Sequence, residues 1–282
     1  MTARRWQSPG RGFVPSRSRG QCFLTSREFV ERIVQIIAPV NDEPLVEIGP
    51  GTGQLSFPLL SAGANLTAIE TDETLVDELR SRLAEQAGDH FEVVHDDILR
   101  LDLAGFLGER FDRPVRVCGN LPYSVASAIL LALLEVHPRL ADMTLMFQLE
   151  VAERLVASPG TKAYGYLSVV TQQLTEPTLA LQIPPEAFRP RPKVLSGLVR
   201  LRMRPEPPSV GDPDLFRTVV KGLFAHRRKT IANNLGFFRS LGFDISEVRD
   251  GLERLGIAAS LRAEMLSVDE FAAISRFCAS LR

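Results

Sequence analysis

The sequence predicts an α/β protein with a mostly parallel sheet, an antiparallel edge and a small all-α domain at the C-terminus. Three observations support this. Short apolar segments alternate with amphipathic ones between residues 45 and 147, which is typical of a parallel sheet with helices on both faces. Two closely following strand-like segments then suggest an antiparallel edge. Beyond residue 213 every segment has helical periodicity.

The composition favours a globular chain that forms one large domain and a small one. It has 282 residues, of which 45% are hydrophobic and 24% charged. No apolar stretch approaches the about 20 residues that span a membrane, and a secretory signal is not recognisable. Cys22, Cys118 and Cys278 are widely separated, which favours a reducing cytosol. No cysteines or histidines have metal-binding spacing. We therefore expect a soluble, cytoplasmic protein without a metal site.

The N-terminal half contains the predicted parallel sheet. Residues 1–19 are rich in Arg, Gly, Ser and Pro, which predicts a flexible basic arm. Ser26 is placed to cap a helix whose apolar residues recur at helical spacing, namely Phe29, Ile33, Ile36 and Ile37. Parallel strands are predicted at 45–48, 66–70, 91–95, 115–118 and 143–147. Connecting helices are predicted before Gly63, at 73–86 with Asp72 as its cap, and at 124–136.

The pattern changes after Ala163. A helix is predicted at 167–174, and strands at 177–183 and 197–202 would close the sheet as an antiparallel pair. The proline-rich segment 205–212 predicts a linker. Helices are predicted beyond it at 215–224, 230–235, 246–255 and 268–277. We therefore expect one domain at 20–204 and a helical domain at 213–282, in which basic residues outnumber acidic ones.

A glycine run, Glu47–Gly53, follows the first parallel strand. Its glycines allow a sharp turn and a close approach of the backbone to a ligand. Glu70 ends the next strand, where a carboxylate can accept hydrogen bonds from both hydroxyls of a ribose. Asp97 follows the third strand and could accept from an adenine amino group. These residues predict an adenosine-containing cofactor. S-adenosylmethionine fits better than a dinucleotide, because no second phosphate-binding feature is present.

The segment Asn120-Leu121-Pro122-Tyr123 follows the fourth strand, at the edge where open α/β sheets place their sites. Methylation of an exocyclic adenine nitrogen is difficult, because its lone pair is delocalised into the ring. The amide oxygen of Asn120 can accept hydrogen bonds from that amino group and so localise the lone pair. Tyr123 offers an aromatic face for a base taken out of its helix, and Pro122 stiffens the turn. The segment therefore predicts N6-methylation of adenine without a strong general base.

Together these motifs resemble the dimethyladenosine transferase family of small-subunit ribosomal RNA, from about Gly20 to Leu281. Gly20–Leu24 resembles the family's Gly-Gln-Asn-Phe-Leu motif. Residues 47–53 and 68–72 resemble its two cofactor motifs, and 120–123 is identical to its catalytic motif. Further similar segments are 162–168, 188–194, 224–230 and 261–267. The resemblance implies the Rossmann-like fold of class I methyltransferases.

The resemblance also implies an activity: S-adenosylmethionine-dependent N6,N6-dimethylation of two adjacent adenosines near the 3′ end of small-subunit rRNA. The enzyme would be a monomer acting on the rRNA or on a pre-assembled small subunit. The implied cofactor contacts are Cys22, Leu24, Gly49, Gly51, Gly53, Glu70, Asp97 and Asn120. The implied catalytic residues are Asn120, Leu121, Pro122, Tyr123 and Phe188, with Phe188 stacking on the flipped base opposite Tyr123. The implied phosphate contacts are Arg189, Arg191, Lys193, Arg227, Arg228 and Lys229.

Two positions depart from the family pattern. Cys22 stands where the family has an asparagine that contacts the cofactor. If that contact uses the backbone, cysteine can replace asparagine; if it uses the amide side chain, cofactor affinity should be weaker. The side chain of Cys22 itself is best described as small and apolar. Leu149 replaces a lysine that is common before Glu150, which removes one charge near the site.

Two other functions stay open. A large-subunit rRNA adenine methyltransferase of the macrolide-resistance type shares the fold and the 120–123 motif, although residues 164–168 and 227–229 favour the small-subunit class. A ribosome-assembly factor could keep the fold without required catalysis, although the complete site favours an enzyme. Single residues also have alternatives. Phe188 could be a hydrophobic plug between the sheet and the linker, and each basic cluster could be a solvated surface.

Overall fold

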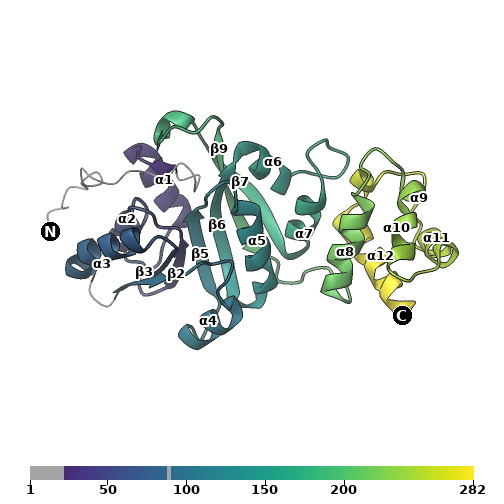
Figure 1. Cartoon of the computed structure of the whole chain (residues 1–282), viewed down its shortest axis with the longest axis horizontal. Helices are drawn as coiled ribbons and strands as arrows, with labels where there is room; N and C mark the ends of the chain where they lie inside the picture. The colour runs from purple at the N-terminus through teal and green to yellow at the C-terminus, as the bar shows by residue number, and fades with distance from the viewer. Residues whose placement is uncertain (1–21, 88–89) are drawn as a thin grey trace. The chain divides into compact units, whose positions relative to one another are not determined.

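The computed structural model describes residues 22–87 and 90–282, so the predicted arm at residues 1–19 lies outside the described residues. The chain divides into two compact units, and Figure 1 shows their elements. The first unit comprises the residues through 152 together with 178–203, and the second comprises 153–177 and 204–282. The segment 153–177, expected in the first domain, thus groups with the helical unit.

A seven-stranded sheet forms the centre of the first unit, in the order β4-β3-β2-β5-β6-β9-β7. The strands are β2 (Pro44–Ile48), β3 (Asn65–Glu70), β4 (Phe91–His95), β5 (Val115–Asn120), β6 (Leu140–Gln148), β7 (Thr175–Ile183) and β9 (Ser196–Met203). The pairs from β4 to β6 are parallel, whereas β6 and β9 are antiparallel. This confirms the predicted mostly parallel sheet. The chain runs outward from β2 to β4 and then returns to β5, so the strand order reverses between β2 and β5.

Six α-helices begin in the first unit, within the described part of the chain. They are α1 (Arg27–Ile37), α2 (Ser56–Ser61), α3 (Glu73–Ala87), α4 (Leu103–Arg110), α5 (Ala126–Glu135) and α6 (Leu149–Leu155). Asp72 caps α3 by accepting from the backbone N–H of Thr74 at 3.1 Å. Ser26 precedes α1 as expected, but its side chain makes no capping hydrogen bond. The sequence pattern does not reveal α4, because Gly105 and Gly108 weaken its helical propensity.

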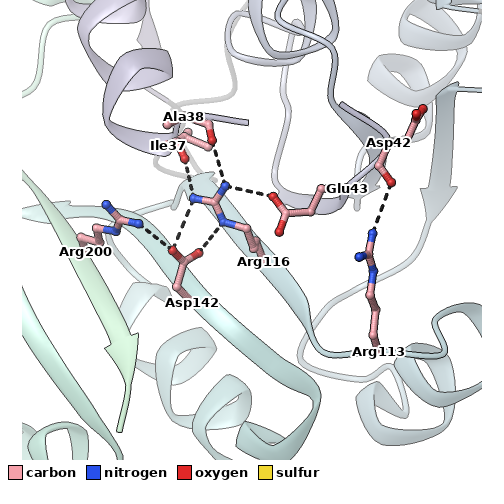
Figure 2. Close-up of polar contacts among 8 residues, drawn as sticks. All are labelled: Ile37, Ala38, Asp42, Glu43, Arg113, Arg116, Asp142 and Arg200. Carbon is pink, nitrogen blue, oxygen red and sulfur yellow. Dashed lines mark hydrogen bonds and ion pairs between the residues drawn. The ribbon is translucent and has the colours of Figure 1, made fainter. Parts of the chain in front are cut away.

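A buried arginine joins several elements at the amino-terminal ends of the parallel strands (Figure 2). Arg116 of β5 donates from Nε to Asp142 of β6 at 2.9 Å. Its Nη1 donates to the backbone carbonyl of Ala38 at 3.1 Å and to Glu43 at 3.3 Å, and its Nη2 donates to the carbonyl of Ile37. Only 10% of the Arg116 side chain is exposed. The buried charge is tolerated because carboxylates and carbonyls surround the guanidinium.

Arg200 of β9 extends this network by donating to Asp142 at 3.1 Å. We define the Arg116 clasp as Ile37, Ala38, Glu43, Arg116, Asp142 and Arg200. The clasp connects the end of α1, the residue before β2, and the neighbouring strands β5, β6 and β9. By contrast, Arg113 lies at the surface and reaches the backbone carbonyl of Asp42 at 3.4 Å (Figure 2). The clasp lies at the opposite strand ends from the glycine run, so it stabilises the sheet away from that loop.

The second unit is helical, as predicted for the C-terminal part of the chain. Its helices are α7 (Tyr166–Leu174), α8 (Pro213–Leu223), α9 (Ile231–Asn234), α10 (Gly236–Ser240), α11 (Ile245–Arg254) and α12 (Val268–Ser280). α7 contacts α8 and α12. The ring of Phe224 lies 6.3 Å from that of Tyr164 and 5.6 Å from that of Phe271. None of the helices in the described ranges is long and apolar enough to cross a membrane.

The predicted linker at 205–212 is packed against the second unit. The carbonyl of Val210 accepts from Ser275 of α12 at 2.9 Å, and the carbonyl of Pro208 accepts from Gln173 of α7 at 3.0 Å. Ser275 is fully buried. These contacts hold the backbone of the segment at two places. The proline-rich segment therefore belongs structurally to the helical unit.

Candidate active site

A cavity of about 320 Å³ lies at the carboxyl ends of β2, β3 and β5, where the strand order reverses. Open α/β sheets bind ligands at this position, because the loops that leave adjacent strands diverge there. The structure brings ten of the predicted residues to the lining: Cys22, Leu24, Gly49, Gly51, Glu70, Asp97, Asn120, Leu121, Pro122 and Tyr123. Gly53 and Phe188 are not part of it. Among the described residues, no group of histidine, cysteine and acidic side chains could hold a metal ion.

The glycine run turns through conformations that favour glycine. Gly49, Gly51 and Gly53 have φ values of 65°, 57° and 81°. At Gly51 an added Cβ would lie 2.7 Å from Cε1 of Phe23, and at Gly53 it would lie 2.8 Å from the ring of Phe57. Gly51 thus lets an aromatic side chain from β1 (Phe23–Leu24) approach the loop. Gly53 instead allows close packing behind the loop, which explains why it does not line the cavity.

Glu70 holds the glycine loop to the end of β3. Its Oε2 accepts from the backbone N–H of Gly51 at 3.1 Å. Its Oε1 accepts from the backbone N–H groups of Thr71 at 2.9 Å and Asp72 at 3.0 Å. Oε1 also accepts from the hydroxyl of Thr71 at 3.4 Å, so a further hydroxyl donor would bind at Oε2, which accepts only one of these hydrogen bonds. The residue therefore shapes the loop and also presents a carboxylate to the cavity.

Two further polar side chains lie beside the loop. Glu47 is buried and accepts from the hydroxyl of Ser56 at 2.6 Å. Burial raises the pKa of Glu47 to about 7; the Ser56 hydrogen bond acts against this, and the charge of Glu70 adds to it. Gln54 donates to the hydroxyl of Thr52 at 3.1 Å, while its Oε1 is buried and has no partner among the described residues. A buried orphan acceptor in a cavity lining indicates a polar ligand there.

Asp97 lies at the rim of the cavity, after β4. Its Oδ1 accepts from the backbone N–H of Leu99 at 3.0 Å. Its Oδ2 lies 3.7 Å from the guanidinium of Arg100, and 40% of the Asp97 side chain is exposed. The backbone N–H of Asp97 donates to Asp96, which also lines the cavity. Asp97 is therefore accessible to a ligand that enters from the solvent side.

The segment before α1 contacts the 120–123 motif through its backbone. The side-chain Nδ2 of Asn120 donates to the carbonyl of Cys22 at 2.9 Å. Because only the NH₂ group can donate, this contact determines which way the amide points. The Oδ1 of Asn120 has no hydrogen-bond partner in the described part of the chain. The thiol of Cys22 makes no part of this contact, and burial raises its pKa.

The rest of the 120–123 motif is divided between core and cavity. Asn120 is the last residue of β5, so the sheet determines its backbone position. Leu121 is 1% exposed, so it belongs to the core as well as to the cavity lining. Pro122 and Tyr123 line the cavity, and the hydroxyl of Tyr123 lies 2.5 Å from that of Ser196. The motif thus presents one amide and one aromatic ring at the same edge of the sheet.

Phe188, expected to stack on the target base, is buried and does not line the cavity. Its side chain is fully buried in a hydrophobic cluster that includes Leu24 and Ile183. It belongs to β8 (Phe188–Arg189), which pairs with β1 so that Phe188 lies opposite Leu24 and Arg189 opposite Phe23. Strand alternation turns Phe188 inward and Arg189 outward. In this structure Phe188 therefore packs in the core of the first unit, and its stacking on a target base stays a prediction.

The predicted RNA contacts of the first unit lie on an exposed loop. Arg189, Arg191 and Lys193 are exposed. Arg191 contacts the carboxylate of Glu186, with 61% of its side chain exposed. Arg189 donates to the carbonyl of Phe188 at 2.8 Å. Cationic groups therefore gather on the segment that joins β8 and β9, where a phosphate backbone can reach them.

The predicted RNA contacts of the second unit differ from one another. Arg227 donates to Glu264 at 3.0 Å and to the carbonyl of Tyr164 at 2.8 Å, so it supports the loop before α7. Arg228 and Lys229 are exposed, and neither makes an ion pair within the described residues. The structure therefore assigns a packing contact to Arg227 and leaves Arg228 and Lys229 accessible.

The sheet order, the glycine loop after β2 and the carboxylate that ends β3 define a class I methyltransferase. Solved structures agree on this fold. A dimethyladenosine transferase from Plasmodium falciparum is similar with a TM-score of 0.76 at 22% identity, covering 89% of this chain and 95% of that chain. The 23S rRNA methyltransferase ErmE is similar with a TM-score of 0.67 at 25% identity, covering 91% and 99%.

Sequence comparison defines the family. Residues 15–280 match the family described as Ribosomal RNA adenine dimethylase. Proteins named Ribosomal RNA small subunit methyltransferase A from Moorella thermoacetica and Geobacter metallireducens are 41% and 38% identical to this chain. The alignments cover 94% and 95% of this chain, and 93% and 96% of those proteins. The chain therefore belongs to the ribosomal RNA adenine dimethylase family and is an rRNA adenine dimethyltransferase.

Sequence reasoning missed several residues of the cavity and its support, three of which make notable contacts. Phe23 covers Gly51, Gln54 supplies the orphan acceptor, and Ser196 contacts Tyr123. A signal for Phe23 is its place between Cys22 and Leu24, two predicted cofactor contacts. Gln54 and Ser196 carry no comparable signal, since their roles depend on contacts made in the folded chain.

Proposed function

We propose that this enzyme uses S-adenosylmethionine to dimethylate N6 of two adjacent adenosines near the 3′ end of small-subunit rRNA. The observation that carries this proposal is the orientation of Asn120. Its NH₂ group donates to the carbonyl of Cys22, which leaves Oδ1 as an acceptor at the cavity. An adenine amino group is a donor that such an oxygen selects. The names of the relatives from Moorella and Geobacter support the small subunit as the source of the RNA.

The donor and acceptor groups of the cavity fit an adenosine-containing cofactor. Glu70 would receive the ribose hydroxyls, and Asp97 would receive the adenine amino group. Gln54 and Glu47 lie beside the glycine loop and would face the polar amino-acid end, where Gln54 has an unpaired acceptor. When bound, the cofactor supplies an electrophilic methyl group on a positively charged sulfur. The chain's own groups hold and orient it.

Asn120 would activate the target nitrogen by orienting its amino group through a hydrogen bond. Its Oδ1 accepts a hydrogen bond from the amino group, which draws the nitrogen lone pair out of conjugation and aims it at the methyl carbon. The cofactor, held by Glu70 and Asp97, would supply the methyl group and leave without it, and the methylated nitrogen would release one proton to solvent. Tyr123 does not serve as a base, because burial raises its pKa and keeps the phenol protonated. The same cycle repeated on each nitrogen gives dimethyladenosine.

Tyr123 would provide the stacking surface for the target base. Its ring lines the cavity on the same edge as Asn120. Phe188 would have to leave the hydrophobic core to offer a second face, which exposes a large apolar ring. We therefore assign the platform to Tyr123 and a packing role to Phe188.

Basic side chains on each unit would contact the RNA backbone. Arg189, Arg191 and Lys193 belong to the first unit, and Arg228 and Lys229 to the second. These residues would contact phosphates without reading sequence. The enzyme would act as a monomer in the cytoplasm, on the rRNA or on a pre-assembled small subunit.

The test is to incubate the protein with tritium-labelled S-adenosylmethionine and either unmodified small subunits or unmodified large-subunit rRNA. Label on two adjacent adenosines near the small-subunit 3′ end is the expected result. Label on large-subunit rRNA would select the resistance-type enzyme instead. Binding to subunits without label would indicate an assembly factor and would overturn the proposal.

A further inference from the structure

The hydroxyl groups of Tyr123 and Ser196 lie 2.5 Å apart, although the residues are 73 positions apart in the chain. Ser196 is fully buried, whereas Tyr123 is half-buried and lines the cavity. The phenol end of Tyr123 therefore reaches inward to the sheet while its ring remains at the cavity. A side chain held at its far end has little freedom to turn about its two side-chain torsions.

Ser196 is a rigid anchor because of its position in the sheet. It is the first residue of β9 and lies opposite Gln148 in the antiparallel ladder between β6 and β9. Neighbouring residues in that ladder restrict its backbone. Burial raises the pKa of the Tyr123 phenol, with the Ser196 hydrogen bond acting against it, and either of the two hydroxyls can donate in the contact.

Ser196 also ends the basic loop, which begins at Arg189 and carries Arg191 and Lys193. The residue before Ser196 is tied down as well, since the carbonyl of Leu195 accepts from the backbone N–H of Leu149 at 2.9 Å. The aromatic platform and one end of the basic loop therefore share a single attachment point. The sheet thereby sets the spacing between the surface for a base and the surface for phosphates.

We infer that Ser196 is a positioning residue for the target base: its hydroxyl holds the Tyr123 ring at the angle at which an adenine stacks, next to the basic loop that holds the RNA backbone. Ser196 acts through Tyr123 and does not touch the reacting atoms. This inference rests on the proposed methylation of adenosine in RNA.

A double-mutant cycle tests the inference through the turnover number. Ser196→Ala and Tyr123→Phe each remove the same hydrogen bond from a different side. Each should lower kcat on unmodified small subunits by about tenfold, with cofactor affinity nearly unchanged. The double variant should be no slower than the slower single variant, and Ser196→Thr should recover most of the rate because it keeps the hydroxyl. Wild-type kcat in Ser196→Ala, or rate reductions that multiply in the double variant, would overturn the inference.

A second readout does not depend on methyl transfer. RNA with 2-aminopurine at the target position loses fluorescence when the base stacks on an aromatic ring, and Ser196→Ala should leave more fluorescence at saturating protein. Equal quenching by wild type and variant would overturn the inference. A quenching difference without methylation by the wild type would retain the role of Ser196 and refute the proposed function.

Ser275→Ala is the matched control for removal of a buried hydroxyl. Ser275 is also fully buried, and its hydroxyl donates to the carbonyl of Val210 at 2.9 Å. This variant should lose stability to a similar extent while keeping kcat and the quenching. If it reproduced both defects of Ser196→Ala, the effects would be structural and the inference would fail.

Discussion

Glu47 and Ser56 form a 2.6 Å hydrogen bond in the buried wall of the cavity. Burial raises the pKa of Glu47 from 4.5 to about 7. Between these two values the folded protein keeps a proton that the unfolded chain has released. The free energy of unfolding therefore decreases as the pH rises from about 4.5 to about 7, and this contribution is lost above 7.

The first prediction concerns this pH dependence. Glu47→Gln keeps the shape of the side chain and removes the titration, so stability should fall less between pH 5 and pH 8 than in the wild type. The difference should reach up to about 3 kcal/mol. Urea unfolding of the cofactor-free protein at both pH values measures it. Glu253→Gln, at an exposed helical site, is the control and should leave the wild-type slope unchanged.

The second prediction concerns Asn120. Asn120→Ala removes the acceptor that the Cys22 carbonyl orients, so methyl transfer should slow by at least about 100-fold. The unfolding midpoint and the order of magnitude of cofactor affinity should remain. Single-turnover transfer of labelled methyl groups measures the effect, and Asn65→Ala, at the exposed start of β3, is the control. Retained turnover would remove Asn120 from the mechanism.

The third prediction concerns Glu70, whose carboxylate accepts from three backbone N–H groups. Glu70→Ala should weaken cofactor binding by about 100-fold, because it removes the ribose acceptor and also releases the glycine loop. Calorimetry with S-adenosylmethionine measures the affinity. Chemical unfolding of the cofactor-free protein separates the second effect, since the loop contacts exist without ligand. An unchanged affinity would refute the ribose assignment.

The fourth prediction concerns the Arg116 clasp. Arg116→Met leaves Glu43 and part of Asp142 without a buried cation, so the free energy of unfolding should fall by about 3 kcal/mol or more. Arg113→Ala should change it by less than about 0.5 kcal/mol, because that side chain lies at the surface. Urea unfolding measures both. A large drop in cofactor affinity in folded Arg116→Met would contradict the separation of the clasp from the cavity.

The fifth prediction separates the cationic residues of the second unit. Charge reversal at Arg228 and Lys229 should flatten the dependence of RNA affinity on salt by about 0.7–0.9 in log–log slope for each phosphate that the variant no longer neutralises. Lys221→Glu, at an exposed site on α8, should leave the slope nearly unchanged. Arg227→Ala should instead lower stability, because Glu264 and the carbonyl of Tyr164 lose their donor. An unchanged slope in the first variant would place the RNA elsewhere.

Much of the fold can be predicted from the sequence because its strands and longer helices have strong local patterns. The parallel strands are apolar and short, and Asp72 marks the start of α3. The sequence does not predict α6, because this helix is only seven residues long and follows β6 directly, with no turn to separate the two patterns. The sequence does not predict α10 either, because this helix begins at Gly236 and a glycine is more typical of the end of a helix than of its start.

A residue of the candidate site can be predicted from the sequence where its side-chain chemistry and its position at the end of a strand both indicate the same role. Glu70 and Asn120 follow this rule, since each ends a parallel strand at the cavity. Phe188 does not, because its direction depends on a partner strand more than 160 residues earlier in the chain. The contact from Cys22 is made by its carbonyl, which every residue type possesses. Such contacts leave no signature in side-chain identity.

The strand β5 carries two separable functions along six residues. Arg116 near its start takes part in the clasp, and Asn120 at its end faces the cavity. Because Arg116 and Asn120 are about 13 Å apart in an extended strand, substitutions in the clasp can adjust thermal stability without changing the geometry of the reaction. In a hotter or colder habitat, substitutions in the Arg116 clasp would change the stability of the protein and leave its rate of rRNA modification unchanged.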